Sequence, residues 1–477
     1  MKEKLNDLSN DKDSIPNNKL NKYIKIVPII SIIITTIIIL LSINYIKKEK
    51  YEKEESDNKK EEKEPQDKEK EEEEIVIDKC ITGENDKCLK CEKNECISCN
   101  YKYNLINGTC VANFSFKATY ETDEEDENIE LINYIYSFYI IDMEIDENQV
   151  IPSYDYTFKT KGIHTIYFTM NISNLNTLFS MFSLIDKLTS IYFTKEFDTQ
   201  NINNMQGLFY ECSKLKSVDI SNFNINKVKD MSFMFLDCIS LNSIKLPSNN
   251  NSKLEKMNSM FYNCSKLISL DLSNFKAENV IDMSFLFSEC NNLTTINFTN
   301  FKTNNLKKMN GMFKNCNSLI SIDLSGFNAE NITNMENLFE GCTSIISINF
   351  TNFKTPKLEN IVSMFKNCNS LKFVNMSYFN VEKLNNFSSL FYGCSSLTSI
   401  DLSKLNIRRI RDMDYMFAEC TSLIYLDISS FKYNYVLYAT FKDFVTKLPL
   451  SGKIKLSRAI YSIIRDFIPD TWKRDFI

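Results

Sequence analysis

The 477-residue sequence predicts an α/β solenoid, in which about ten similar units, each a strand plus a short helix, stack on one another. Three observations lead to this prediction. Cysteines recur every 26 residues, a phenylalanine stands three residues before each cysteine, and an apolar strand pattern follows it. A unit this short cannot bury its apolar face alone, so neighbouring units must stack to form a core.

Each unit combines two apolar patterns. Apolar residues such as Met205, Leu208 and Phe209 stand seven, four and three residues before a cysteine, and this spacing predicts one face of a short helix. After the cysteine, the alternation of Val218 and Ile220 predicts a strand. We expect the thiols to pack as small hydrophobic groups, because no CxxC or histidine neighbours accompany them. The cysteines are Cys212, Cys238, Cys264, Cys290, Cys316, Cys342, Cys368, Cys394 and Cys420.

A degenerate copy precedes the first of these cysteines. Met181, Phe182 and Phe193 keep the phase there, and Ile185 takes the place of the cysteine. The predicted solenoid therefore covers residues 175–431.

The polar position between the two apolar strand residues should point outward. In a curved solenoid these side chains would lie on the concave face, where we predict that a ligand binds. Two alternatives remain: a solvated polar face with side-chain ladders, and a calcium site formed by paired aspartates, which no loop motif supports. The predicted ligand-binding residues are Asp219, Lys245, Asp271, Asn297, Asp323, Asn349, Asn375, Asp401 and Asp427.

The N-terminal region has the organisation of a membrane-anchored protein. Residues 26–46 carry no charge over 21 positions, which predicts a transmembrane signal anchor behind a short cytoplasmic tail, residues 1–25. A cleaved signal peptide is the alternative, but no small-residue cleavage site follows. Residues 47–79, with ten lysines and fifteen acidic residues, predict a disordered charged stalk.

This arrangement predicts a plasma-membrane protein with a cytoplasmic N-terminus and an extracellular C-terminus. The lysine count on the two sides of residues 26–46 favours the opposite orientation. A large domain can be translocated regardless of flanking charge, and the cysteine pattern that follows favours an exterior location. Asn-x-Ser/Thr sequons such as that at Asn263 would then permit glycosylation.

Residues 80–110 predict a small disulfide-rich module, because this segment has few apolar residues and requires a covalent staple. A zinc site is the alternative, although the four-residue gap between its two CxxC pairs is short for one. The pairing of the cysteines is not defined by the sequence. They are Cys80, Cys88, Cys91, Cys96, Cys99 and Cys110.

Two further segments flank the repeats. Residues 117–170 alternate aromatic and β-branched residues and predict a β-rich N-terminal cap that shields the first open edge. Residues 432–477 lose the 26-residue period and predict a helical C-terminal cap. The only histidine, His164, lies in a strand pattern, where we expect a packing role rather than catalysis.

Composition excludes several functions. A net charge of −6 and the lack of a basic stripe with interleaved aromatics argue against nucleic acid as a partner. Nine glycines form no phosphate-binding motif, and one histidine leaves little scope for acid–base or imidazole–metal chemistry. We therefore expect neither a cofactor nor an enzyme.

The repeat resembles the BspA-like leucine-rich repeat. The pattern Met-x-x-Met-Phe-x-x-Cys-x-x-Leu-x-Ser-Ile-Asp-Leu-Ser-x-Phe is clearest at 283–301 and 309–327. The segment 80–110 is similar to small cysteine-rich modules of EGF or furin type. The repeat resemblance implies a leucine-rich-repeat-type fold and a cell-surface protein that binds protein or glycan ligands on another cell or on matrix. The alternatives are a surface-coat or spacer protein without a specific ligand and, with reversed topology, a cytosol-facing scaffold.

Overall fold

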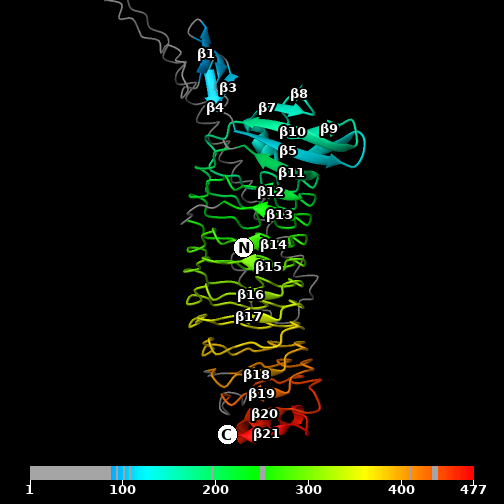
Figure 1. Ribbon diagram of the computed structural model, residues 1–477, viewed down its shortest axis with the longest axis vertical. Helices are drawn as coiled ribbons and strands as arrows, with labels where there is room; N and C mark the ends of the chain where they lie inside the picture. Colours follow the sequence, from blue (N-terminus) through cyan, green and yellow to red (C-terminus); the bar gives the residue numbers. More distant parts are fainter. Residues whose placement is uncertain are drawn as a thin grey trace, which may run out of the picture. The chain divides into compact units, whose positions relative to one another are not determined.

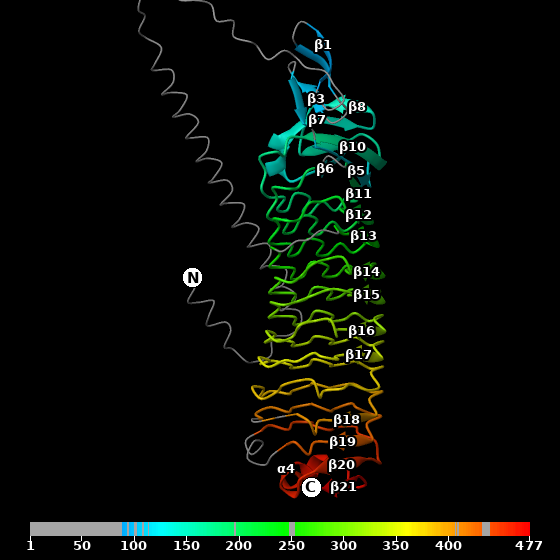
Figure 2. The same ribbon diagram turned by 60° about the vertical axis from the view of Figure 1, so that its left-hand side comes forward.

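The described part of the chain is a stack of coils in a computed structural model (Figure 1, Figure 2). The predicted tail, membrane anchor and stalk, and also Cys80, lie outside this part. The structure describes residues 88–92, 95–99, 103–106, 109–112, 114–194, 197–247, 253–405, 407, 410–431 and 439–477.

The predicted plasma-membrane location needs correction. Within the described residues, no helix is both long enough and apolar enough to cross a membrane. The segment predicted to do so, residues 26–46, falls outside them. Single-pass anchoring, with a cytoplasmic N-terminus and an extracellular C-terminus, therefore has no structural support and forms no part of the function proposed below.

Two short hairpins begin the described chain. The first joins β1 (Cys88–Glu92) to β2 (Glu95–Cys99), and the second joins β3 (Tyr103–Ile106) to β4 (Thr109–Ala112). Backbone register sets Cys88 opposite Cys99 and Cys91 opposite Cys96. The predicted disulfides remain a prediction.

A mixed sheet joins the predicted β-rich cap to the first coils. Strand β5 runs antiparallel to both β10 and β11, and from β11 onward the solenoid strands are parallel. Because β5 occupies the free side of β11, the first edge of the parallel stack is not open. In spatial order the sheet contains β13 (Ser243–Lys245), β12 (Ser217–Asp219), β11 (Leu188–Phe193), β5 (Phe114–Thr122), β10 (Gly162–Met170), β7 (Ile140–Ile145) and β8 (Asn148–Val150).

A smaller ribbon completes this N-terminal region. Strands β6 (Glu127–Glu130) and β9 (Asp155–Phe158) pair antiparallel, and the 3-10 helix η1 (Tyr134–Tyr139) leads into β7. The buried Tyr120 hydroxyl donates to the Leu131 carbonyl and so connects the sheet to the segment that directly follows β6.

Each later coil except that of residues 373–375 contributes a strand of only three residues. From β14 to β17 the strands pair in two-coil units, β14 with β15 and β16 with β17, whereas β18 and β19 continue into two further strands near the C-terminus. The sequence follows the same alternation, since Leu272 and Leu324 follow the first strand of a unit and Phe298 and Phe350 follow the second. These strands are β14 (Ser269–Asp271), β15 (Thr295–Asn297), β16 (Ser321–Asp323), β17 (Ser347–Asn349), β18 (Ser399–Asp401) and β19 (Tyr425–Asp427).

The predicted short helices are wrong. Where the sequence has the helical spacing, the described coils make consecutive turns. Each of these turn segments has two residues with positive φ, four positions apart, as at Phe233 and Asp237. Alternate N–H groups bond within the turn and to the next coil: Met234 donates to Met231, whereas Phe235 donates to Met260. Every turn thus satisfies its backbone donors without an α-helical ladder.

A column of stacked phenylalanines forms the centre of the solenoid. From Phe182 to Phe417 each ring lies nearly parallel to the next; Phe261 and Phe287, for example, have centroids 5.5 Å apart and planes 2° apart. The column ends at Phe444, which meets Phe417 edge-on at 76°. These rings are fully buried, so the stack supplies much of the apolar core.

The C-terminal segment continues the solenoid further than predicted. Residues 441–447 repeat the turn, and β20 (Lys453–Leu456) and β21 (Lys473–Phe476) extend the parallel sheet from β19. Among the described residues of this segment, helix is found in α4 (Arg458–Ile464) and the 3-10 turn η2 (Arg465–Phe467). The predicted all-helical cap is therefore one more coil, then a single helix and a last strand.

One coil in the array is joined less tightly than the others. Residues 373–375 occupy the strand position but form no strand between β17 and β18. A second ladder of single bridges runs along the stack, and it too omits the step from Asn360 to Asn386. The turns of this coil keep their bonds, as from Phe365 to Leu390, so the opening involves the strand position and the segment that leads into the turns.

Candidate functional site

The predicted binding residues form one column along the strands. Register aligns Asp219 with Lys245, Asp271 with Asn297, and Asp323 with Asn349. Side chains from Lys245 to Asp401 are exposed and Asp219 is half-buried. Asp427 differs, because β20 continues the sheet beside it, and only 3% of its surface is exposed.

Most of these side chains have a local structural role that the sequence did not reveal. The Asp323 Oδ1 accepts the backbone N–H of Ser325 at 2.8 Å, and the Asn349 Oδ1 accepts that of Thr351 at 3.0 Å. An Asp or Asn that bonds two residues onward closes an Asx turn. Each coil of this column except that of Lys245 therefore uses one side-chain oxygen to turn the chain after the strand.

The charges in the column are partly compensated. The Lys245 ammonium donates to the Asp219 Oδ2 at 2.9 Å. The Ser273 backbone N–H holds the pKa of Asp271 below its usual value, and the Ser325 hydroxyl does the same for Asp323. The carboxylates are thus ionised at neutral pH.

A shallow cavity of about 610 Å³ opens on this face where the strand ladder stops. Asp323, Asn349 and Asn375 of the predicted column line it, and the structure adds two aromatic residues, Phe373 and Tyr378. The Phe373 ring is 61% exposed although a phenylalanine gains by burial. The cavity thus combines amides, a carboxylate and hydroxyls with an exposed aromatic surface.

The sequence prediction did not include Phe373, because it considered only the outward position between the two apolar strand residues. The residue just before the inward strand position is Ser or Thr in many coils, as Ser321 and Ser347 are. Aromatic residues replace Ser or Thr in this column at two positions, Phe373 and Tyr425, and this departure was the signal available.

The repeat cysteines have a structural role. All nine are buried and free, and each Sγ donates to a phenylalanine carbonyl of the preceding coil, as Cys316 does to Phe287 at 3.1 Å. Burial raises the pKa of these thiols, to about 12 for Cys290. A thiol with a raised pKa is a poor nucleophile, so this column belongs to the core.

His164 lies in a geometry that superficially resembles a catalytic triad. Its Nδ1 is 2.7 Å from Asp146 Oδ2, and its Nε2 is 3.2 Å from the Thr122 hydroxyl. The Nε2 also faces the Thr160 carbonyl at 2.9 Å, which requires a hydrogen on that nitrogen. Since Nε2 then has no free lone pair to accept a proton from Thr122, and the ring is stacked on Phe158 and buried, this cluster is a packing element.

Metal binding is a further possible role for side chains of the described residues. No three or more His, Cys, Asp or Glu side chains there come together as ligands would.

The fold and the strand face define a class of protein, the repeat solenoid with an exposed polar face. The chain belongs to the family DUF285, described as "Mycoplasma protein of unknown function". Three matches, at residues 156–269, 244–347 and 333–445, together cover more than half of the chain. This agrees with the repeat resemblance in the sequence, whereas the EGF- or furin-type resemblance of 80–110 has no support.

Other comparisons add little. No curated protein matches this chain. Among solved structures, the chain is similar to the "Crystal structure of TLR13-ssRNA13 complex" at 12% identity, with a TM-score of 0.21. That similarity covers 58% of this chain and 50% of the other, about half its length, and at this TM-score it carries no argument.

Proposed function

We propose that the protein is a binding module without catalytic activity, and that its strand face binds a protein or glycan ligand. The observation that carries this proposal is the cavity at Phe373, where an exposed aromatic ring adjoins the amides of Asn349 and Asn375. An aromatic surface beside a few directed polar groups is the usual composition of a recognition site.

Several features support a role in binding rather than catalysis. His164 is held in packing contacts, and the repeat thiols are buried. The strand column supplies directed acceptors such as the Asp323 carboxylate, whose Oδ1 also accepts the Asn349 amide at 3.0 Å. Groups held in this way lose little entropy when a ligand binds.

The test compares two exposed phenylalanines. Full-length protein, Phe373→Ala and Phe138→Ala are applied to an array of purified glycans and matrix proteins. Phe138 is 77% exposed and lies in η1, away from the cavity residues, so it is a matched control. We expect Phe373→Ala to weaken the strongest wild-type signal by roughly tenfold, as loss of an aromatic anchor does, and Phe138→Ala to retain it. Equal retention by both variants contradicts the proposal.

A spacer function is the second candidate, and the regular phenylalanine column favours it. A stack from Phe182 to Phe417 keeps the coils in register whether or not a ligand binds. The same array distinguishes the two, because a spacer gives no signal that depends on Phe373.

A further inference from the structure

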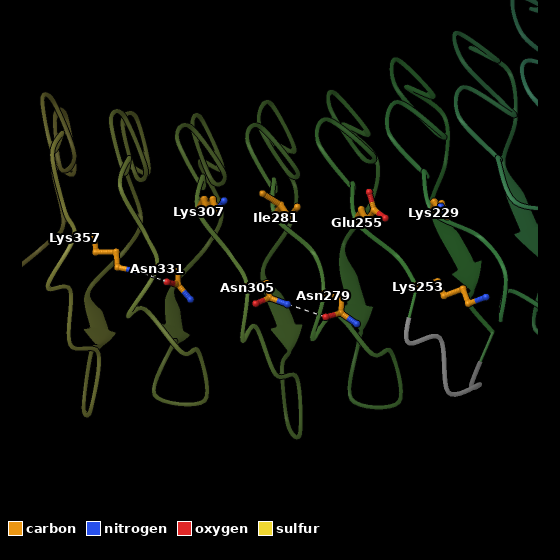
Figure 3. Close-up of a pocket in the computed structure, with 9 residues that line it drawn as sticks. All are labelled: Lys229, Lys253, Glu255, Asn279, Ile281, Asn305, Lys307, Asn331 and Lys357. Atoms are coloured by element: carbon orange, nitrogen blue, oxygen red, sulfur yellow. Dashed lines mark hydrogen bonds between the residues drawn. The ribbon is translucent and has the colours of Figure 1, made fainter.

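A second groove lies outside the predicted binding face. Its volume is about 730 Å³, and Figure 3 shows its side chains in two rows across successive coils. We call it the lysine groove, and it is lined by Lys229, Lys253, Glu255, Asn279, Ile281, Asn305, Lys307, Asn331 and Lys357.

The repeat itself creates the two rows. Each turn begins at a residue such as Met283. The residue three positions before it is buried, and the residues two and four positions before it point outward. In the coil before Met283 these are Val280, Ile281 and Asn279. Alternation along an extended segment puts both outward residues on one side. Neighbouring coils are joined there by backbone bonds, as from Ile281 to Glu255, so the rows are continuous.

The charge of these rows contrasts with that of the chain. Four lysines and one glutamate line the groove, although the chain has a net charge of −6. From Asn201 to Lys383 the row four before the turn holds only lysine and asparagine: Asn201, Lys227, Lys253, Asn279, Asn305, Asn331, Lys357 and Lys383.

A column of aspartates directly before the turns is paired with lysines of its own. Asp230 lies 3.6 Å from Lys256, and Asp282 lies 3.9 Å from Lys308. These aspartates also cap the turns, since the Asp282 Oδ1 accepts the Ser284 N–H. These aspartates therefore interact with lysines and turn N–H groups that do not line the groove.

Hydrogen bonds between coils organise the side chains of the groove. The Asn305 amide donates to the Asn279 Oδ1 at 2.7 Å, and the Lys357 ammonium donates to the Asn331 Oδ1 at 2.6 Å. Both bonds appear as dashed lines in Figure 3. They fix a row of amide and ammonium donors at about 4.8 Å per coil.

This arrangement selects the class of ligand. A long row of donors and cations suits a linear chain that carries anionic groups at intervals. None of the nine lining residues is aromatic, so the base stacking that retains single-stranded nucleic acid is not available here. Ile281 is the one apolar residue among them, which is too little for the anchor of a folded protein.

We propose that the lysine groove binds a linear acidic polysaccharide along the solenoid axis. Lys229, Lys253, Lys307 and Lys357 pair with its carboxylate or sulfate groups, and the asparagine amides contact its hydroxyls. This site is separate from the Phe373 cavity and does not depend on the function proposed for the strand face.

The test uses full-length protein with heparin, polygalacturonate, neutral dextran and single-stranded poly(dT). Calorimetry at about 0.05 M salt, where charge interactions are weakly screened, should detect binding of heparin, polygalacturonate or both, and none of dextran. Heparin alone identifies sulfate as the anion, and polygalacturonate alone identifies carboxylate. Binding should weaken as salt is raised.

Two triple variants of equal charge change provide the control. Lys253→Glu, Lys307→Glu and Lys357→Glu together should weaken binding roughly tenfold or more. Lys216→Glu, Lys266→Glu and Lys372→Glu, exposed lysines outside the groove, should retain it. Equal loss in both triples, absent binding of both polyanions, or tighter binding of poly(dT) overturns the proposal. Phe373→Ala should leave heparin binding unchanged, which separates this site from the strand face.

Discussion

The turn side and the strand side of each coil follow the same 26-residue period. They differ in how much the residue at a given position varies from coil to coil. On the turn side, Phe313 and Cys316 are fully buried and recur in almost every coil. On the strand side, the column changes from Asp323 to Asn349, and an aromatic residue, Phe373, appears beside Asn375. The strand ladder and the ladder of single bridges are both interrupted between β17 and β18, whereas bonds between successive turns, as from Phe365 to Leu390, are kept. The turn side therefore holds the stack, and the strand side is free to acquire binding groups.

The largest effect should come from removing one ring of the turn-side column. Phe313→Ala leaves a cavity between Phe287 and Phe339 and should lower the free energy of unfolding by about 3–5 kcal/mol. Phe373→Ala on the strand side should change it by less than about 0.5 kcal/mol. Urea denaturation measures both. Similar losses for the two variants would remove the contrast between the sides.

A smaller effect should follow from a single methyl group in the turn. Gly341 has φ +76°, and a Cβ there would approach the Asn315 Oδ1 within 2.0 Å. Gly341→Ala should therefore lower the melting temperature and cost about 1–3 kcal/mol. The matched control is Asn337→Gly, where φ is also positive and glycine relieves strain. Loss of stability in the control but not in Gly341→Ala contradicts the turn geometry.

The smallest effect concerns the Asx turns of the strand side. Asp323→Ala removes the acceptor for the Ser325 N–H and should cost about 0.5–1.5 kcal/mol. Since the folded pKa lies below the ordinary value of 3.8, this carboxylate stabilises the fold above that pH and loses its effect as pH falls through the folded pKa. Melting temperatures should converge for wild type and Asp323→Asn at low pH. A constant difference down to the folded pKa contradicts this linkage.

The sequence predicts the stack because its columns are periodic. Cysteine and phenylalanine positions identify the buried side, and the polar strand column is found by alternation. The helix prediction failed because consecutive turns also place apolar residues at i, i+3 and i+4. Left-handed positions such as Gly207 and Gly311 in one row, and Gly341 and Gly393 in the other, were the available signal. An α-helix would not need glycine at these points.

The candidate sites were less predictable, for two physical reasons. The Phe373 cavity depends on a break in one ladder, which is a local departure from the period. The lysine groove assembles residues such as Lys253, Lys307 and Lys357 that are far apart in sequence and meet only through stacking. A search for a contiguous basic stripe therefore passes over it.

The pairing of strands within two coils also sets how such an array can change length. Asp271 and Asp323 occupy the same position in successive units, 52 residues apart. Adding or deleting one whole unit keeps every Leu272-type and Phe298-type residue beside its usual neighbour. Removing a single coil would bring two like layers together and mismatch their volumes. From β14 to β17, duplication of a two-coil unit would therefore preserve the packing, and each added unit would lengthen the lysine groove and the strand face together.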